Sequence, residues 1–255
     1  MTNKSLHENA KQLRLCYFNA NTELVEQDKE LHTSYAKIIE LEIAEREKRR
    51  LENYIRASKV KDFQALTNYD WNWPRSIDRQ AVTKLFNFKF VEEKENVVFI
   101  GPNGVGKTML AQNLIHEAAV KGFKAVFVEA AEMLSDLIAQ SSRSTLERAL
   151  LKYTKPQILA IDEVGYLSYD TRHADLLFQI IHRRAKRTST IITTNKPFGE
   201  WREMFPNATS VTALVDRLIE QCVVVPIDAD SYRAKRFADR KKAAESAAKK
   251  AEQKK

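Results

Sequence analysis

A glycine-rich loop between an apolar run and an amphipathic segment constrains the fold of this chain more than any other feature. Residues 101–108 read Gly-Pro-Asn-Gly-Val-Gly-Lys-Thr and fit the pattern G-x-x-x-x-G-K-[ST]. The loop follows the apolar residues 97–100 and precedes apolar residues at helical spacing. Glycines let main-chain N–H groups approach a phosphate, and a following helix adds its positive N-terminus. The pattern therefore predicts the strand, loop and helix that open a nucleotide-binding α/β domain.

The side chains of this loop predict a nucleoside triphosphate site with a magnesium ion. Lys107 is expected to reach the β and γ phosphates, and the hydroxyl of Thr108 is expected to bind Mg²⁺. A chance glycine-rich turn is the alternative, and the flanking strand and helix argue against it. The residues expected to contact the nucleotide are Gly101, Pro102, Asn103, Gly104, Val105, Gly106, Lys107, Thr108 and Met109.

The net charge of +8 lies almost entirely at the carboxyl end of the chain. Residues 233–255 contain ten Lys and Arg against three acids, so seven of the eight net positive charges lie there. The segment is rich in Ala, Lys and Glu and lacks glycine and proline, which favours a solvated helix. Such a helix either lies along phosphates or only keeps the chain in solution, and the charge pattern leaves both possibilities open.

Cysteine usage and hydropathy indicate a cytoplasmic protein. Cys16 and Cys222 are far apart, and neither has a metal-binding or redox spacing. Residues 1–15 are polar, unlike a signal peptide, and no apolar run is long enough to span a membrane. We therefore expect no membrane partner and no zinc site.

The 255 residues, 44% of them hydrophobic, suffice for one α/β domain and a smaller part. Residues 1–66 lack glycine and proline and predict a helical N-terminal domain for partner binding or oligomerisation. Residues 67–95 form a linker and a first core helix, 96–230 the core, and 231–255 the basic tail. The aromatic residues of 69–74 are expected to pack the linker onto the core; walling the nucleotide base is the alternative.

The core alternates strands with helical segments. Strands are expected near residues 96–100, 124–128, 157–161, 189–193 and 222–225. The alternation predicts an α/β fold with a five-stranded parallel sheet flanked by helices and joined by right-handed crossovers.

Two adjacent acids follow the apolar run 158–161. Ligands bind at the carboxyl edge of parallel sheets, so Asp162 is expected to hold Mg²⁺ opposite Thr108. Glu163 is expected to orient or deprotonate the attacking water. Solvated acids at a strand end are the alternative. The spacing between Lys107 and Asp162 leaves room for an extra strand and helices, which favours an ATPase over a small GTPase-like switch.

Two further polar residues are candidates for catalysis. Asn195 ends the β-rich run 189–194 and is expected to face the γ-phosphate, unless it merely terminates a strand. Arg217 lies in a helical segment, where it is either a surface charge or an arginine finger that reaches a neighbouring subunit.

Several strings in the chain closely resemble IstB-like transposition helper ATPases, which are AAA+ proteins related to DnaC helicase loaders. Besides the loop, they are Asp-Glu-Val-Gly-Tyr-Leu from 162, Thr-Asn-Lys-Pro-Phe-Gly-Glu-Trp from 194, Asp-Arg-Leu from 216 and Ser-Tyr-Arg from 231. The resemblance implies an AAA+ P-loop NTPase core behind a small all-helical domain. It implies sensor 1 for Asn195 and the arginine finger for Arg217. Arg233 is the candidate second sensor, although the usual helical lid is missing.

The resemblance also implies ATP as cofactor, ATP hydrolysis, a homo-oligomer on double-stranded DNA and a partner transposase in DNA transposition. A helicase loader is the alternative, and a scaffold that binds ATP without hydrolysing it is another. We expect largely sequence-independent DNA binding, because no recognition-helix motif is present. The candidate DNA contacts besides the tail are Arg143, Arg148, Lys152, Arg183 and Arg184.

Overall fold

The structure is a computed structural model that describes residues 3–165, 170–205 and 210–252. The chain divides into two compact units, Met1–Asn53 and Tyr54–Lys255, which are described separately.

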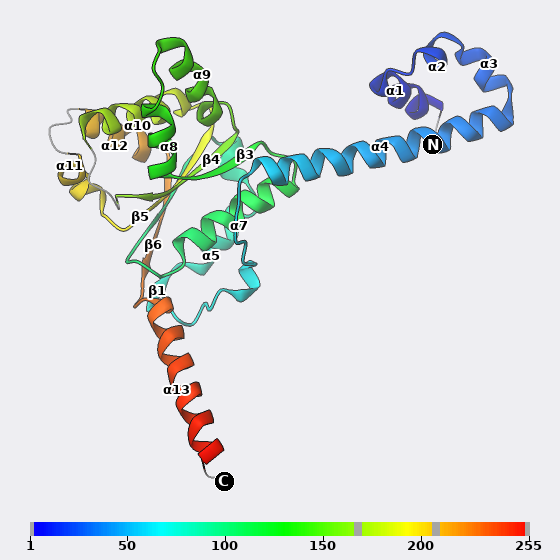
Figure 1. Ribbon diagram of the computed structural model, residues 1–255. Coiled ribbons are helices and arrows are strands. Elements are labelled where there is room, and N and C mark those ends of the chain that lie inside the picture. Colours follow the sequence, from blue (N-terminus) through cyan, green and yellow to red (C-terminus); the bar gives the residue numbers. More distant parts are fainter. Residues whose placement is uncertain (1–2, 166–169, 206–209, 253–255) are drawn as a thin grey trace. The chain divides into compact units, whose positions relative to one another are not determined.

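The first unit is all helical (Figure 1). It contains α1 (Asn3–Leu13), α2 (Cys16–Ala20), α3 (Thr22–Gln27) and most of α4 (Lys29–Ala57). These helices enclose a small apolar cluster whose buried members are Leu6, Ala10, Leu13, Phe18, Val25 and Ile39. The exposed side of α4 carries pairs of acid and arginine four residues apart, which favour the helix by a few tenths of a kcal/mol each.

The second unit begins upstream of the boundary expected at residue 66. The carbonyl of Ser58 accepts a hydrogen bond from Phe127 N at 2.8 Å. Asn113 Nδ2 donates to the carbonyl of Gln64, also at 2.8 Å. Residues 58–64 are therefore hydrogen-bonded to the α/β core. The sequence did not indicate this, because its helical pattern continues to residue 57 without a break.

In the part of the chain that the structure describes, six strands form one sheet in the order β1-β6-β2-β5-β4-β3. They are β1 (Ser76–Ile77), β2 (Asn96–Ile100), β3 (Ala125–Glu129), β4 (Ile158–Val164), β5 (Ser189–Thr194) and β6 (Cys222–Asp228). Strands β2 to β6 are parallel, which confirms the expected five-stranded core. The sheet also has an antiparallel edge strand, β1, that was not expected.

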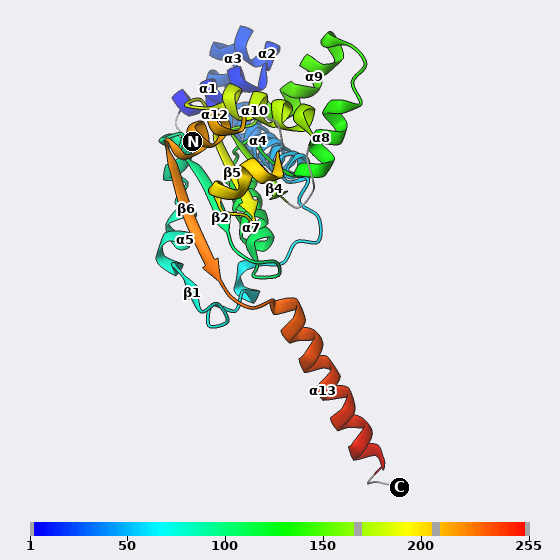
Figure 2. The ribbon, with the colours of Figure 1, turned by 90° about the vertical axis from the view of Figure 1, so that its left-hand side faces the viewer.

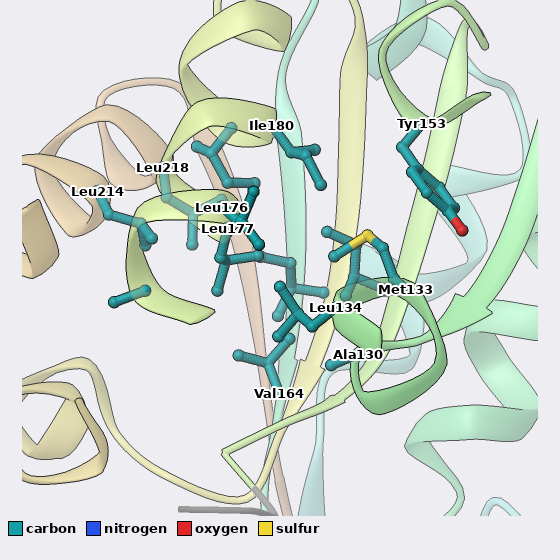
Figure 3. Close-up of a cluster of buried hydrophobic side chains, with 14 of the residues drawn as sticks. Ala130, Met133, Leu134, Tyr153, Val164, Leu176, Leu177, Ile180, Leu214 and Leu218 are labelled. Atoms are coloured by element: carbon teal, nitrogen blue, oxygen red, sulfur yellow. The ribbon is translucent and has the colours of Figure 1, made fainter. Parts of the chain in front are cut away.

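Helices cover both faces of the sheet (Figures 1 and 2). One face packs against α8 (Ala130–Ile138), α9 (Arg143–Thr154), α10 (Thr171–Arg184) and α12 (Ser210–Ile219). Figure 3 shows Met133 and Leu134 of α8, Leu177 and Ile180 of α10, and Leu214 and Leu218 of α12 converging in this layer. The other face packs against α5 (Arg79–Leu85), α6 (Lys89–Glu92) and α7 (Lys107–Val120).

The strand sequences explain this arrangement. Val98 packs into the first layer, whereas its neighbours Val97 and Phe99 pack into the second. Successive side chains of a strand point to opposite faces, so a strand covered on both sides is apolar throughout. The remaining elements are two 3₁₀ turns, Leu66–Asn68 and Phe198–Glu200, and the helices α11 (Trp201–Met204) and α13 (Tyr232–Glu252). Among the helices described, none is both long and apolar enough to cross a membrane.

Candidate nucleotide site

The loop between β2 and α7 requires glycine at Gly104 and Gly106. Their φ angles are 80° and 98°, in the left-handed region that glycine adopts at little cost. A Cβ on Gly106 would lie 2.5 Å from a ring carbon of Tyr69, and one on Gly104 would lie 2.4 Å from the Ser231 hydroxyl oxygen. The glycines therefore serve the turn and the close approach of two other segments.

Lys107, the first residue of α7, is folded inside the loop. Its Nζ donates to the carbonyls of Gly101 and Pro102, both at 2.7 Å, and the residue is 8% exposed. Burial lowers the pKa of Lys107, while Asp162 and Glu163 act in the opposite direction. The amine is thus placed where phosphate oxygens can replace the two carbonyls.

The two acids at the end of β4 have different surroundings. Asp162 is buried, and its Oδ1 accepts hydrogen bonds from the hydroxyls of Thr108 (3.2 Å) and Thr193. Burial raises the pKa of Asp162, against the effect of these hydrogen bonds. The Thr108 hydroxyl and the Asp162 carboxylate are hard oxygen donors, which Mg²⁺ prefers. Together they fit the expected magnesium site, which phosphate oxygens and water would complete.

Glu163 is exposed and lies in the cleft because the strand is irregular there. Its φ is 57°, and the pairing of β4 with β5 shifts register between Ile161 and Val164. Such a bulge redirects one side chain without interrupting the strand. Asp162 therefore stays in the interior while Glu163, one residue further, lines the cleft.

Thr193 connects the two acids and was missed at the sequence level. Its hydroxyl donates to Asp162 Oδ1 and accepts from the main-chain N–H of Glu163 at 2.9 Å. The residue is buried in β5, two positions before Asn195. A threonine in a β-rich run gives no signal of such a role, because threonine is common in strands.

A cleft of about 880 Å³ adjoins the loop. Glu163, Thr194 and Asn195 line one part of it, and Arg233 and Arg236 line another. The cleft thus brings together the loop, Glu163 and Asn195.

The linker aromatics act partly as expected. The hydroxyl of Tyr69 donates to the carbonyl of Val105 at 3.1 Å, and Trp73 Nε1 donates to the carbonyl of Asp230 at 2.8 Å. Burial raises the pKa of Tyr69 to about 12, so its hydroxyl remains a donor at neutral pH. Tyr69 and Trp73 also line the cleft, whereas Trp71 packs against the Tyr69 ring. Tyr69 and Trp73 therefore pack onto the core and also line the cleft, and contact with the nucleotide base stays a prediction.

The start of α13 returns to the loop. Tyr232 N donates to the carbonyl of Gly104 at 3.0 Å. Lys235 Nζ lies 3.3 Å from Asp70 Oδ2 and 4.4 Å from the centre of the Trp73 ring. These contacts place Arg233 and Arg236 at the cleft, and residue spacing alone indicated neither Tyr232 nor Arg236.

Arg217 lies apart from the cleft of its own chain. It is exposed on α12 and is not among the described residues that line the cleft. A role in hydrolysis therefore requires a second subunit.

The expected DNA contacts have very different surroundings. Arg184 is 1% exposed, contrary to the expectation of a surface contact. Its guanidinium donates to the carbonyls of Tyr153, Pro156 and Ser189 and to the Thr190 hydroxyl. Burial lowers the pKa of Arg184 to about 9, so the group stays charged at neutral pH. Arg184 thus binds buried carbonyls at the end of α9, in the segment before β4 and at the start of β5, and it is not available as a DNA contact.

The other four candidates lie nearer the surface. Arg183 makes a bidentate ion pair with Glu147 at 2.7 and 2.8 Å. Lys152 pairs with Asp136 at 3.1 Å. Arg143 and Arg148 are exposed on α9.

Comparison with known proteins agrees with this geometry. Residues 8–241 match the family described as IstB-like ATP binding protein. The chain is 35% identical over 197 residues to the ATP-binding protein of insertion sequence IS5376 from Geobacillus stearothermophilus, covering 77% of this chain and 78% of that protein. It is 34% identical over 190 residues to the ATP-binding protein of IS21 from Pseudomonas aeruginosa, covering 74% and 72%.

Solved structures establish the fold. The crystal structure of DnaI aligns with a TM-score of 0.52 at 20% identity, over 70% of this chain and 92% of DnaI. The replication initiator DnaA, bound to AMPPCP and single-stranded DNA, aligns with a TM-score of 0.51 at 19% identity, over 71% of this chain and 50% of that one. The expected family resemblance and fold are confirmed, and the chain belongs to the family of IstB-like ATP-binding proteins.

Proposed function

We propose that this protein hydrolyses ATP, assembles as a homo-oligomer on double-stranded DNA and assists the transposase of an insertion sequence. One observation carries the enzymatic part: Lys107, Thr108 and Glu163 line one cleft, the buried Asp162 is hydrogen-bonded to Thr108, and Thr193 holds both acids. The insertion-sequence relatives support the biological part. Because ATP and chromosomal DNA are available in the cytoplasm, we propose that it acts there.

Each residue of the site has a defined task in this proposal. Main-chain N–H groups of residues 101–108 and the amine of Lys107 hold the phosphates. Thr108 and Asp162 would bind Mg²⁺, which would neutralise charge on the phosphate oxygens. Glu163 takes a proton from the attacking water or orients it, and Asn195 donates to that water or to the γ-phosphate. Arg233 is proposed to contact the phosphates from the opposite side of the cleft, as a second sensor.

The position of Arg217 supports the proposed homo-oligomer. An arginine finger supplied in trans stabilises charge on the transferred phosphoryl group and is worth ~10³-fold or more in rate. Arg217 is exposed and lies outside its own cleft, as such a finger requires. We propose that ATP brings Arg217 of one subunit to the cleft of the next.

DNA binding is proposed to use exposed cations and to depend little on base sequence. Arg143 and Arg148 are the simplest candidates because they are exposed, whereas Arg183 and Lys152 would first have to exchange their carboxylate partners for phosphates. Phosphate contacts release counterions and make binding sensitive to salt. We therefore expect affinity for unrelated duplexes to fall together as salt is raised.

The experiment is a measurement of phosphate release with long duplex, with single-stranded DNA and without DNA. We expect duplex to stimulate the wild type most, and Glu163→Gln to bind ATP but to lose turnover by 100-fold or more. Stimulation by single strands alone would favour a helicase loader. Equal, negligible release by the wild type and by Glu163→Gln would indicate a scaffold that only binds ATP.

A further inference from the structure

Helix α13 carries a dense positive charge on an exposed surface. Between Tyr232 and Lys242 it has six cations and one acid, Asp239. The cations are Arg233, Lys235, Arg236, Arg240, Lys241 and Lys242. Every described side chain from Arg236 to Lys242 is exposed, and the ring of Phe237 is 72% exposed.

The helix begins at the nucleotide loop. Tyr232 N donates to the Gly104 carbonyl, and Lys235 pairs with Asp70 in the linker. The rings of Trp73 and Tyr232 meet edge to face with their centres 5.8 Å apart. The first turn is therefore bonded to two walls of the cleft.

Three arginines form a row along one face of α13. Arg233, Arg236 and Arg240 are spaced by three and four residues, so they follow one another on the same side of a helix. Arg233 and Arg236 line the cleft, and Arg240 does not. With a rise of 1.5 Å per residue, Arg240 lies ~10 Å along the helix from Arg233. The row thus starts at the phosphate site and continues onto an exposed surface.

The composition of α13 favours a helix, but the exposed side chains of residues 236–242 add little tertiary packing. Helices that lack tertiary packing are marginal in water, and like charges one turn apart weaken them further. A polyanion removes this repulsion and can order the helix. Among anionic partners, the DNA backbone matches a linear row of arginines, because its charges also repeat along a line.

We propose that the exposed part of α13, centred on Arg240 and Lys241, binds the phosphate backbone of duplex DNA and so couples DNA binding to the nucleotide site. The proposal rests on the proposed function. DNA that orders α13 also holds its first turn in place, and this turn bears Arg233 and Arg236, which line the cleft. Bound DNA therefore raises affinity for the nucleotide, and by thermodynamic reciprocity the nucleotide raises affinity for DNA by the same factor.

The test is the double variant Arg240→Gln/Lys241→Gln, in which neither residue lines the cleft. Binding of a fluorescent duplex of unrelated sequence is measured by anisotropy at several salt concentrations, with and without a non-hydrolysable ATP analogue. Loss of two phosphate contacts lowers the slope of log affinity against log salt by about 2 and weakens binding by on the order of tenfold. The enhancement of DNA affinity by the nucleotide also falls toward one.

Two control variants isolate the cause. Lys84→Gln/Lys94→Gln removes the same charge from exposed positions elsewhere in the second unit and leaves slope and affinity near those of the wild type. Arg240→Lys/Lys241→Arg keeps both charges and retains binding. Affinity of the first double variant for a fluorescent ATP analogue without DNA matches the wild type, which shows that the cleft is intact.

Four results would overturn the proposal. The first is a double variant that binds duplex as the Lys84/Lys94 control does. The second is a double variant that loses affinity for single-stranded DNA but keeps its affinity for duplex. The third is a double variant that no longer assembles with ATP in the absence of DNA, which would assign α13 to subunit contacts. The fourth is a wild type that binds no duplex, which would also overturn the proposed function; in the first three cases duplex binding by the wild type leaves that function standing.

Discussion

At the scale of single residues, Thr193 is the clearest case of a side chain that acts through others. Thr193→Val keeps the shape of the side chain but removes the hydroxyl that holds Asp162 and the N–H of Glu163. Misplacing the two acids should lower kcat by tenfold or more with little change in KM, because the interaction acts on the transition state.

The control for Thr193 is Thr190→Val in the same strand. Thr190 is equally buried, but its hydroxyl accepts from Arg184 and lies outside the cleft. Both variants should lose stability in thermal unfolding, and only Thr193→Val should lose kcat, with Thr193→Ser restoring most of it. Equal kcat values for the two valine variants would reduce Thr193 to a structural role.

Gly106 tests the geometry of the loop. Gly106→Ala places a Cβ at a φ of 98° and 2.5 Å from the Tyr69 ring, so the loop or the linker must move. We expect a loss of at least about 1 kcal/mol in the free energy of unfolding and a large loss of ATP affinity. Gly199→Ala is the matched control, since nothing lies within 4 Å of its Cβ and its φ is not positive. Calorimetry with ATP and thermal unfolding measure both effects, and similar results for the two variants would refute the argument.

Asp162 combines function with a cost in stability. Burial raises its pKa above the unfolded value, so folding favours the protonated form. Its contribution to stability is complete below the unfolded pKa near 4 and is lost as pH rises through the folded pKa. Asp162→Asn removes the charge and keeps an oxygen for both threonines, so Tm of the nucleotide-free protein at neutral pH should rise by a few degrees. Mg·ATP binding should be lost, and a fall in Tm would contradict this account.

At the scale of elements, neighbouring arginines of α10 show how burial separates two identical side chains. Arg184→Met removes the donor of three hydrogen bonds to buried carbonyls, and we expect a loss of about 3 kcal/mol or more in the free energy of unfolding. Arg183→Met breaks an ion pair nearer the surface and should cost less than about 1 kcal/mol. Urea unfolding compares the two, and equal losses would contradict the burial argument.

The elements that the sequence pattern predicted are those with a strong local signal. Apolar runs identified β2, β3, β4 and β6, and the β-branched run 189–194 identified β5. Strand β1 has two residues, Ser76 and Ile77, and is defined by pairing with β6 rather than by its own composition. The bulge at Glu163 was equally hidden, because its positive φ accompanies a hydrogen bond from Glu163 N to the Thr193 hydroxyl in the neighbouring strand, and no local pattern indicates that bond.

At the scale of the whole chain, the cleft combines a part that sequence motifs reveal with a part that they do not. The loop and the acids of β4 are short motifs whose chemistry requires those residue types. The contact between Trp73 and Asp230 joins residues 157 positions apart and depends on polar groups common in any surface. Tyr232 bonds to the loop through its main chain, so its side chain gives no sign of that contact. Long-range packing of this kind explains why a cleft wall was only the alternative for the linker, and why the tail was predicted as a solvated helix with Arg233 alone as a candidate at the site.

If Arg217 completes the cleft of a neighbouring subunit, two inactive variants should complement each other in a mixed assembly. A 1:1 mixture of Arg217→Ala and Glu163→Gln subunits contains some clefts with an intact Glu163 that face an intact Arg217 from the neighbour. Random mixing makes about one cleft in four complete, so activity should recover to about a quarter of the wild type, although each variant alone is nearly inactive.

A second mixture supplies the control for this experiment. Glu163→Gln mixed with Lys107→Ala cannot recover, because both changes affect the cleft of their own subunit and no neighbour replaces either group. Phosphate release with duplex DNA measures both mixtures, and light scattering verifies assembly. Recovery in both mixtures, or in neither while assembly is intact, would mean that Arg217 does not act across the subunit boundary. Recovery in the first mixture alone requires that a complete site be built from two chains, since no single chain in that mixture carries both Glu163 and Arg217.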